Sequence, residues 1–252
     1  MSPSTIQDAE HFFSVYAPCL AQPVVKVADI GAQDINGSLR QVCPAHFEYT
    51  GIDFAHGKGV DVVLDDPYKF PLPDKAFDVV VSSSCMEHSE FFWLTFLEIL
   101  RITKDDGLIY INVPFNAAFH RYPVDCWRFY PDSGVALQNW GRRNGYDCEL
   151  LESYVADQGG HGMVNDFVAT FVKSSAFASR YPDRVVDQRT DYTNGRSNLA
   201  PNFLRLEWET EDQRKLPHMR IRAFRHRIKW AIMDFLGIDR TKKAPGQEAG
   251  GV

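Results

Sequence analysis

Two apolar, β-branched runs that each end in an aspartate constrain the fold of this chain more than any other feature. The first, residues 24–29, ends at Asp29 and is followed two residues later by Gly31. The second, residues 47–53, ends at Asp53, about as far downstream as one strand–helix–strand unit requires. In such a unit two parallel strands end at the same edge of a sheet, and we expect a nucleotide to bind there.

The residue types at these two strand ends suit that ligand. Gly31 lets the backbone approach the ligand closely, and the carboxylate of Asp53 is placed to accept hydrogen bonds from both hydroxyls of a ribose. Charge-assisted hydrogen bonds contribute about 1.5–3 kcal/mol each, so one acid can decide which nucleoside binds. The alternative is an ordinary buried strand and turn, in which each acid caps a helix.

The composition is that of a soluble globular protein. With 27 basic and 33 acidic residues, the mildly acidic balance argues against a general nucleic-acid-binding protein. The five cysteines are scattered without metal-ligand spacing, which is typical of reduced thiols. We find neither a charged-then-apolar leader nor an apolar run long enough to span a bilayer, and we expect a cytoplasmic location.

Strand-like and helix-like segments alternate from residue 24 onward, which predicts a mostly parallel sheet with helices on both faces. The expected strands cover residues 24–29, 49–53, 60–64, 77–82, 108–113, 149–154 and 167–172, the last two as an antiparallel pair. The expected helices cover residues 6–20, 38–42, 91–102 and 133–144, and residues 104–107 form a turn.

A family resemblance emerges downstream of the second run. A third acid, Asp65, closes the expected strand at 60–64, and a Pro-rich loop then leads through Phe77-Asp78 to the sequence SSSCMEH at residues 82–88. With this combination the chain resembles the class I S-adenosylmethionine-dependent methyltransferases, specifically the type 11 branch, over about residues 24–173. The resemblance implies a Rossmann-like α/β fold, S-adenosylmethionine as cofactor, and methyl transfer as the activity.

The resemblance also assigns cofactor contacts by position. Asp29 and Gly31 would lie at the methionine end of the cofactor, with Asp29 helping to bind its ammonium group, and Asp53 would hold the ribose. Phe54 or a neighbour would cover the adenine, and Asp65 with the backbone of Asp66 would read its amino group. The full set implied is Asp29, Gly31, Gln33, Asp53, Phe54, Asp65, Asp66, Ser82 and Ser83.

One departure from the family concerns the loop after the first strand. The family usually has glycine at the positions of Gln33 and Ile35, and this chain has neither. Asn36-Gly37 would supply the tight turn instead, since both residue types tolerate positive φ.

A polar and aromatic segment at residues 114–131 would stand over the carboxyl edge of the sheet, where ligands bind in such folds. It resembles the "H.yP.DyWRf" segment of methyltransferases that accompany glycan and surface-polysaccharide biosynthesis. By this resemblance His120 would remove a proton from a substrate hydroxyl and Asp125 would orient its imidazole. The acceptor would be a small molecule or glycan, contacted by Trp127, Arg128, Phe129 and Tyr130.

A packing role for this segment stays open. Trp127 and Arg128 would then anchor the loop, with Arg128 paired to Asp125 or another acid. His88, directly after the expected cofactor strand, and His161, on a glycine-rich connection, are further candidates for substrate contact. No histidine, cysteine or acid cluster has metal-ligand spacing, so the sequence predicts no metal site.

The C-terminal part carries a different signal. We expect residues 1–178 to form the methyltransferase domain, and residues 179–252 to form a polar loop or cap and a helical appendage. Within 219–236, apolar residues recur at helical spacing opposite arginines and a lysine. Such a helix would either contact a membrane surface peripherally, or pack on the domain or on a second copy in a homodimer.

Two other functions compete with methyl transfer. An NAD-dependent sugar-nucleotide oxidoreductase would also place Asp53 on a ribose, but the chain lacks the Gly-x-Gly-x-x-Gly loop. A non-catalytic scaffold that binds S-adenosylmethionine would explain the altered glycine loop.

Overall fold

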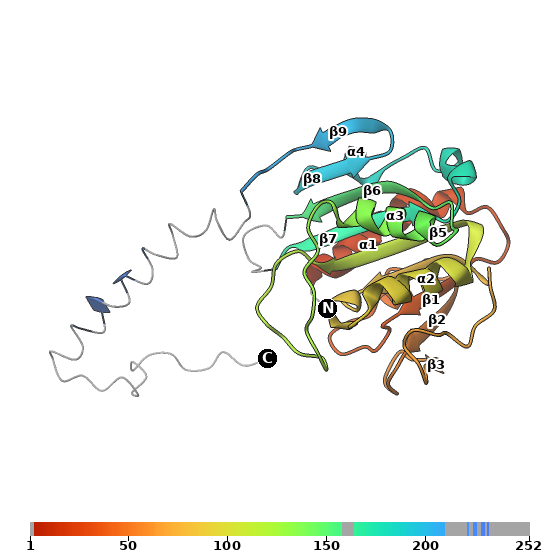
Figure 1. Cartoon of the computed structure of the whole chain (residues 1–252), viewed down its shortest axis with the longest axis horizontal. Helices are drawn as coiled ribbons and strands as arrows, with labels where there is room; N and C mark the ends of the chain where they lie inside the picture. Colours follow the sequence, from red (N-terminus) through yellow and green to blue (C-terminus); the bar gives the residue numbers. More distant parts are fainter. Residues whose placement is uncertain are drawn as a thin grey trace. The chain divides into compact units, whose positions relative to one another are not determined.

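The computed structural model describes residues 3–157 and 164–209, together with Ile221, Phe224, Arg225, Ile228, Lys229 and Ala231. The chain divides into two compact units, Met1–Leu206 and Glu207–Val252. The first unit contains a nine-stranded sheet with helices around it (Figure 1). The helix predicted within 219–236 lies outside the described residues, except for the six residues named above, which are helical and exposed.

The sheet has the strand order β3-β2-β1-β4-β5-β7-β6-β8-β9. Neighbouring strands from β3 to β5 are parallel, and those from β5 to β9 are antiparallel. The strands are β1 (Lys26–Ile30), β2 (Glu48–Asp53), β3 (Val62–Val63), β4 (Phe77–Ser83), β5 (Thr103–Pro114), β6 (Glu149–Ala156), β7 (Asp166–Val172), β8 (Tyr192–Ser197) and β9 (Ala200–Leu204). The mixed α/β, Rossmann-like fold predicted from the sequence is confirmed.

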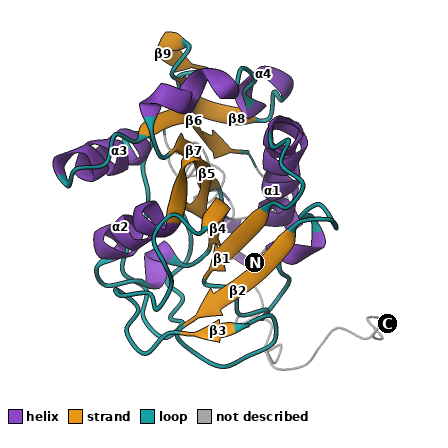
Figure 2. Cartoon of the chain, turned by 90° about the vertical axis from the view of Figure 1, so that its right-hand side faces the viewer, coloured by secondary structure: helices purple, strands orange, loops and turns teal. Residues whose placement is uncertain are grey.

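Helices cover both faces of this sheet (Figure 2). On one face α2 and α3 pack on the sheet through Phe96, Ile99 and Leu137, and on the other α1 packs through Phe12 and Tyr16. The helices are α1 (Pro3–Tyr16), α2 (Phe92–Ile102), α3 (Ser133–Arg143) and α4 (Val185–Gln188), with 3₁₀ turns η1 (Ala17–Cys19), η2 (Leu39–Gln41), η3 (Met86–His88) and η4 (Ser175–Arg180). Among the described helices, none has the length and apolar character that crossing a bilayer requires.

Strand β4 lies at the centre of the parallel part, between β1 and β5, and all seven of its residues are buried. A strand covered on both faces is expected to be a continuous apolar run, and Val79, Val80 and Val81 supply it. Its two serines come only at the carboxyl end, where the site begins.

Two local predictions were wrong. The predicted turn at 104–107 belongs to β5, because Thr103 pairs with Phe77 before a bulge and Leu108 resumes the pairing with Val79. The predicted helix at 38–42 is only the 3₁₀ turn η2, whose first turn is capped by the Ser38 hydroxyl accepting from the Arg40 amide.

The segment that begins at residue 179 also differs from the prediction. We expected a polar loop or cap there, but α4, β8 and β9 extend the sheet beyond β6. Buried Glu152 on β6 holds α4 in place, because its carboxylate accepts hydrogen bonds from the Val185 and Val186 amides at 3.0 Å. The compact unit therefore continues to Leu206, past the boundary expected at 178.

A buried ion pair joins α1 to this extension. Asp8 and Arg189 are 2.5 Å apart, and their side chains are only 2% and 4% exposed. The second carboxylate oxygen of Asp8 accepts from the Asn112 amide on β5 at 3.3 Å. Asp8 thus connects helix, sheet and extension.

We predict that Asp8→Ala lowers the free energy of unfolding by about 3–5 kcal/mol, because it leaves the Arg189 guanidinium buried with less compensation. Urea denaturation followed by circular dichroism measures this change. Glu10→Ala, at an exposed position of the same helix, is the matched control and should change stability little. Equal effects of the two substitutions would contradict the role given to the ion pair.

Candidate active site

The parallel pairing places the predicted acids at one edge of the sheet. Asp29 pairs with Gly51, while Ile30 pairs with both Ile52 and Ser82, so β1, β2 and β4 end together. Side chains alternate along a strand, and Asp29, Asp53 and Ser83 fall on the face covered by α1. Ser82 points to the opposite face, and its hydroxyl donates to the Ile30 carbonyl at 3.0 Å.

Gly31 makes the turn that leaves β1. It has φ +86°, and its amide donates to the Ile52 carbonyl at 2.9 Å. A Cβ at this position would lie 2.5 Å from the Cβ of Cys85, so only glycine fits between the loop and the end of β4. The expected turn at Asn36-Gly37 is made by Gly37, with φ +120°, and Asn36 keeps a negative φ.

Asp53 organises the loops around its carboxylate. One oxygen accepts from the Gln33 amide at 3.1 Å, and the other accepts from the Ala55 amide at 3.1 Å. A carboxylate has about four acceptor positions, so each oxygen keeps one for a ligand. The Gln33 side chain donates to the His56 carbonyl at 3.2 Å, which joins the loop after β1 to the loop after β2.

The Asp29 side chain is buried and is already hydrogen-bonded within the protein. It accepts from the Tyr49 hydroxyl at 2.6 Å. Burial raises the pKa of the Asp29 carboxyl to about 7, and the Tyr49 hydrogen bond opposes this shift. In the described structure Asp29 therefore binds Tyr49, and an ammonium group would have to share that carboxylate.

The remaining predicted cofactor residues lie at the β3 end of this edge. Phe54 is exposed after β2, which leaves a ring face open for stacking. Asp65 and Asp66 are exposed after β3, and the Asp66 side chain accepts from the Tyr68 amide at 2.8 Å. That hydrogen bond turns the chain after β3. Among the described residues, no hydrogen bond fixes the Asp65 side chain.

Buried polar atoms without hydrogen-bond partners gather at the carboxyl edge. Among the described residues seven such side-chain atoms occur, and five of them lie at or just beyond the ends of β4 and β5 or before β7. These five atoms belong to Ser83, Glu87, Asn112, Asn116 and Asn165. Because buried polar groups are normally paired, their concentration here indicates a site built for polar ligands.

The aromatic loop after β5 is anchored by the residues predicted to recognise substrate. Arg128 forms a bidentate pair with Asp125 at 2.5 and 2.8 Å, and it also donates to the Ala118 carbonyl. The hydrogen bond from Arg128 holds the pKa of Asp125 well below its ordinary value. The indole of Trp127 donates to the Ser89 carbonyl at 2.9 Å. This arrangement agrees with the packing alternative for Trp127 and Arg128.

Two predicted histidines meet beside this loop. The rings of His88 and His120 are 5.0 Å apart, edge to face. The Asp125 carboxylate accepts from the backbone amide of His120 at 2.7 Å and lies 3.6 Å from its Nδ1, so it fixes the backbone and does not bond the ring. His161, the third candidate, lies outside the described residues.

Glu87 is the residue that the sequence analysis missed. It precedes His88 in η3 and is only 1% exposed, and burial raises the pKa of its carboxyl to about 8. Its backbone carbonyl accepts from the Cys126 and Trp127 amides, which fastens the aromatic loop over η3. The sequence signal that could have identified Glu87 is an acid directly before a histidine, just after the strand expected to line the cofactor.

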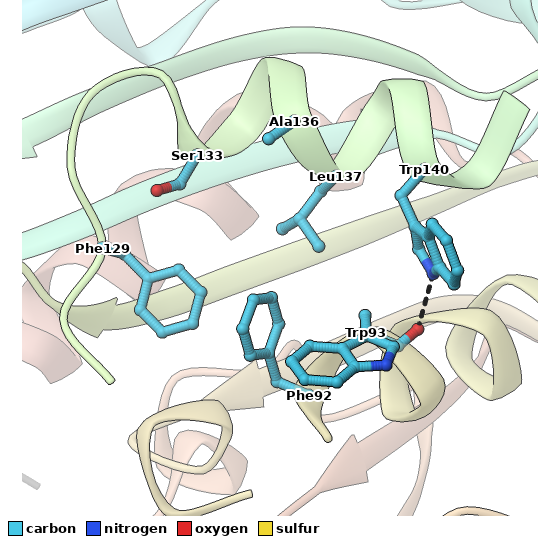
Figure 3. A pocket seen from close by; sticks show the side chains of 7 residues that line it. All are labelled: Phe92, Trp93, Phe129, Ser133, Ala136, Leu137 and Trp140. Carbon is cyan, nitrogen blue, oxygen red and sulfur yellow. Dashed lines mark hydrogen bonds between the residues drawn. The ribbon is translucent and has the colours of Figure 1, made fainter. Parts of the chain in front are cut away.

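An aromatic cavity of about 340 Å³ opens next to the anchored loop (Figure 3). Phe129, predicted as a substrate contact, is buried in its wall, whereas Tyr130 is 57% exposed. The Trp140 indole donates to the Trp93 carbonyl at 2.9 Å and closes one end. The lining residues are Phe92, Trp93, Phe129, Ser133, Ala136, Leu137 and Trp140.

Comparison with known proteins now bears on this site. Residues 15–111, less than half of the chain, match the family described as "Methyltransferase domain". They contain β1 to β4, Gly31 and Asp53, and a search of curated proteins adds no significant match.

Solved structures share the fold at low identity. One is 1,6-didemethyltoxoflavin-N1-methyltransferase of Burkholderia thailandensis, with bound 1,6-didemethyltoxoflavin and S-adenosylhomocysteine (16% identity, TM-score 0.51, covering 68% of this chain and 79% of that one). Another is a proposed sarcosine dimethylglycine methyltransferase of Galdieria sulphuraria (14% identity, TM-score 0.50, 67% and 86% covered). These likenesses show the fold of such methyltransferases and, together with the family match over residues 15–111, support the predicted enzyme class and its cofactor, S-adenosylmethionine.

The residues at the carboxyl edge fit that cofactor. Gly31 leaves no Cβ in the turn, Asp53 keeps acceptor positions for hydroxyls, and Ser83 has a buried hydroxyl without a partner. Asp53 would hold the ribose, and the backbone at Gly31 with Ser83 would face the amino-acid end. When bound, the cofactor supplies a methyl group activated by a sulfonium.

We predict that Gly31→Ala destabilises the protein more than Gly145→Ala does. Both glycines have nearly equal φ, +86° and +89°, so both substitutions incur about 1–2 kcal/mol of backbone strain. Nothing lies within 4 Å of a Cβ at Gly145, whereas Gly31→Ala must also displace Cys85, for about 1–3 kcal/mol more. Thermal unfolding, with calorimetric titration of S-adenosylhomocysteine, measures the difference. Equal losses of stability in the two variants would rule out the close contact between Gly31 and Cys85.

Proposed function

We propose that the protein methylates a hydroxyl oxygen of a sugar or glycan intermediate. The supporting observation is a set of exposed aromatic side chains on the loop that carries His120. Phe119 is 77% exposed and Tyr130 57%, and Tyr122 between them is also exposed. Aromatic rings stack on the apolar faces of sugar rings, and soluble proteins seldom expose several large aromatics together without a ligand.

His120 is placed to take the proton from that hydroxyl. Its Nδ1 lies 2.9 Å from the Ala118 carbonyl oxygen, which can only accept, so Nδ1 carries the proton of the neutral ring. Nε2 then has a free lone pair, and the side chain is about half exposed. The Ala118 carbonyl thus takes the orienting role that the sequence analysis gave to Asp125.

Alignment supplies most of the acceleration in this proposal. The acceptor oxygen loses its proton and bonds to the methyl carbon, and the sulfur keeps the electron pair of the C–S bond that breaks. Holding the acceptor in line contributes roughly 7–11 kcal/mol, and a positioned base adds about 10²–10⁴-fold. The anchored loop, with Arg128 and Trp127 fixed by hydrogen bonds, provides the rigidity that such alignment needs.

Calorimetric titration with S-adenosylmethionine, S-adenosylhomocysteine and NAD⁺ tests the cofactor site. We predict that wild type binds both adenosyl ligands and that Asp53→Ala weakens them by about 10²-fold or more, because two charge-assisted hydrogen bonds are lost. Glu48→Ala, exposed at the other end of β2, is the control and should bind normally. Binding of NAD⁺ alone would favour the oxidoreductase alternative.

Transfer of a radiolabelled methyl group to a panel of glycosides, nucleotide sugars, phenols and amines tests the acceptor class. We predict transfer to sugar hydroxyls, with kcat lowered by about 10²–10⁴-fold in His120→Ala and cofactor affinity unchanged. Transfer only to phenols or amines would refute the sugar assignment. Cofactor binding without transfer to any acceptor would favour the scaffold alternative.

The location and partners of the protein stay predictions. If the glycan acceptor is linked to a lipid, residues 219–236 would contact an anionic membrane peripherally. Alternatively, the same apolar stripe would pack against a second copy in a homodimer. Sedimentation with lipid vesicles, with and without the residues after 211, separates these two.

A further inference from the structure

A cluster of three potential metal ligands lies between η3 and the aromatic loop. Glu87 and His88 follow β4, and His120 follows β5. Each offers one ligand atom, and these atoms lie within 4.8 Å of one another, the only such group among the described residues. Ligands of a tetrahedral Zn²⁺ are about 3.3 Å apart, so small side-chain rotations would bring these atoms onto one ion.

The hydrogen bonds of both imidazoles favour coordination. Nδ1 of His88 bonds the Val124 carbonyl oxygen, and Nδ1 of His120 bonds that of Ala118. Since carbonyl oxygens only accept, each ring carries its proton on Nδ1 and presents the Nε2 lone pair. A backbone carbonyl or carboxylate behind each ligating imidazole is the usual outer shell of a metal site, and Asp125 stands 3.6 Å from Nδ1 of His120.

The burial of Glu87 supports a bound cation independently of the two histidines. Glu87 is fully enclosed, and its Oε2 has no hydrogen-bond partner. An unsatisfied buried polar atom costs about 1–3 kcal/mol, and more when it is charged. The nearest side-chain nitrogen to its other oxygen in the cluster is Nε2 of His88, at 3.7 Å, which donates no proton in this tautomer. A cation between the three groups would give the Glu87 carboxylate a ligand bond and would use the Nε2 lone pair of His88.

The charges around the cluster permit a cation. The positive charge of Arg128 is compensated by its bidentate pair with Asp125. The exposed side of His120 leaves a path for an ion from solvent.

We propose that Glu87, His88 and His120 bind a divalent transition metal, with Zn²⁺ as the best match. Two imidazole nitrogens and one carboxylate oxygen suit Zn²⁺ and its first-row neighbours, whereas Mg²⁺ and Ca²⁺ prefer oxygen ligands. Three protein ligands leave a coordination position open. If the proposed function holds, the acceptor hydroxyl would occupy that position, the metal would lower the pKa of the hydroxyl, and its proton would leave to solvent water instead of to His120.

Metal binding by untagged full-length protein tests this proposal directly. The protein is stripped with EDTA, dialysed, and titrated with ZnCl₂ by calorimetry, and bound zinc is counted by mass spectrometry after gel filtration. We expect one Zn²⁺ per chain, and affinity at least about 100-fold weaker in Glu87→Gln and His120→Ala. His46→Ala, which removes an exposed histidine away from the cluster, should bind as wild type does.

Two readouts keep the test decisive. Co²⁺ in place of Zn²⁺ gives visible absorption bands that should change in His120→Ala, whose half-exposed side chain is not needed for folding. S-adenosylhomocysteine binding by the same variants should be unchanged, which shows that they are folded and that the cofactor site is intact.

Failure of this proposal is distinguishable from failure of the proposed function. The metal site is overturned if wild type binds no stoichiometric Zn²⁺, or if the variants bind it equally well. Zinc binding without methyl transfer to any sugar would leave the metal site standing and refute the acceptor. Methyl transfer without zinc binding would overturn the metal site and leave His120 as the base.

Discussion

The parallel pairing of β1 with both β2 and β4 is the constraint on which the site depends. Parallel strands bring their carboxyl ends to one edge, and here that edge collects Asp29, Asp53 and Ser83. The amide of Gly31 then donates to the Ile52 carbonyl, and Asp53 accepts from the amide of Gln33 two residues further on. The strand ends therefore shape the loops as well as the polar groups, and a single Cβ at Gly31 would disturb both.

Much of this arrangement could be predicted from local sequence, because each buried strand is apolar and ends in a polar residue. Strands β8 and β9 could not, since Asn194-Gly195 and Pro201 are typical of loops. They lie at the open side of the sheet, where an antiparallel edge tolerates polar residues, and Asn194 takes a positive φ of 52° beside an irregular register. Local patterns do not show that a neighbouring strand, β6, is available for pairing.

The aromatic loop shows a different limit. Its residue types were correctly expected at the carboxyl edge, yet sequence alone left open which side chains anchor the loop. Trp127 and Arg128 find partners in Ser89 and Asp125 and become anchors, while Phe119 and Tyr130 stay exposed. Whether a side chain of this loop anchors the loop or contacts a ligand depends on carbonyl and carboxylate groups that lie near it only in the folded protein.

The same limit explains why no metal cluster was expected, since His120 meets Glu87 and His88 only through the anchored loop. The Ala118 carbonyl places the proton of the neutral His120 ring on Nδ1 and leaves Nε2 free, and that tautomer serves a general base and a metal ligand equally well. The two roles exclude each other, because a coordinated nitrogen cannot accept a proton. Glu87 distinguishes these roles: proton removal by His120 gives the enclosed Glu87 carboxylate no partner, whereas a cation bound by the three side chains would give that carboxylate one.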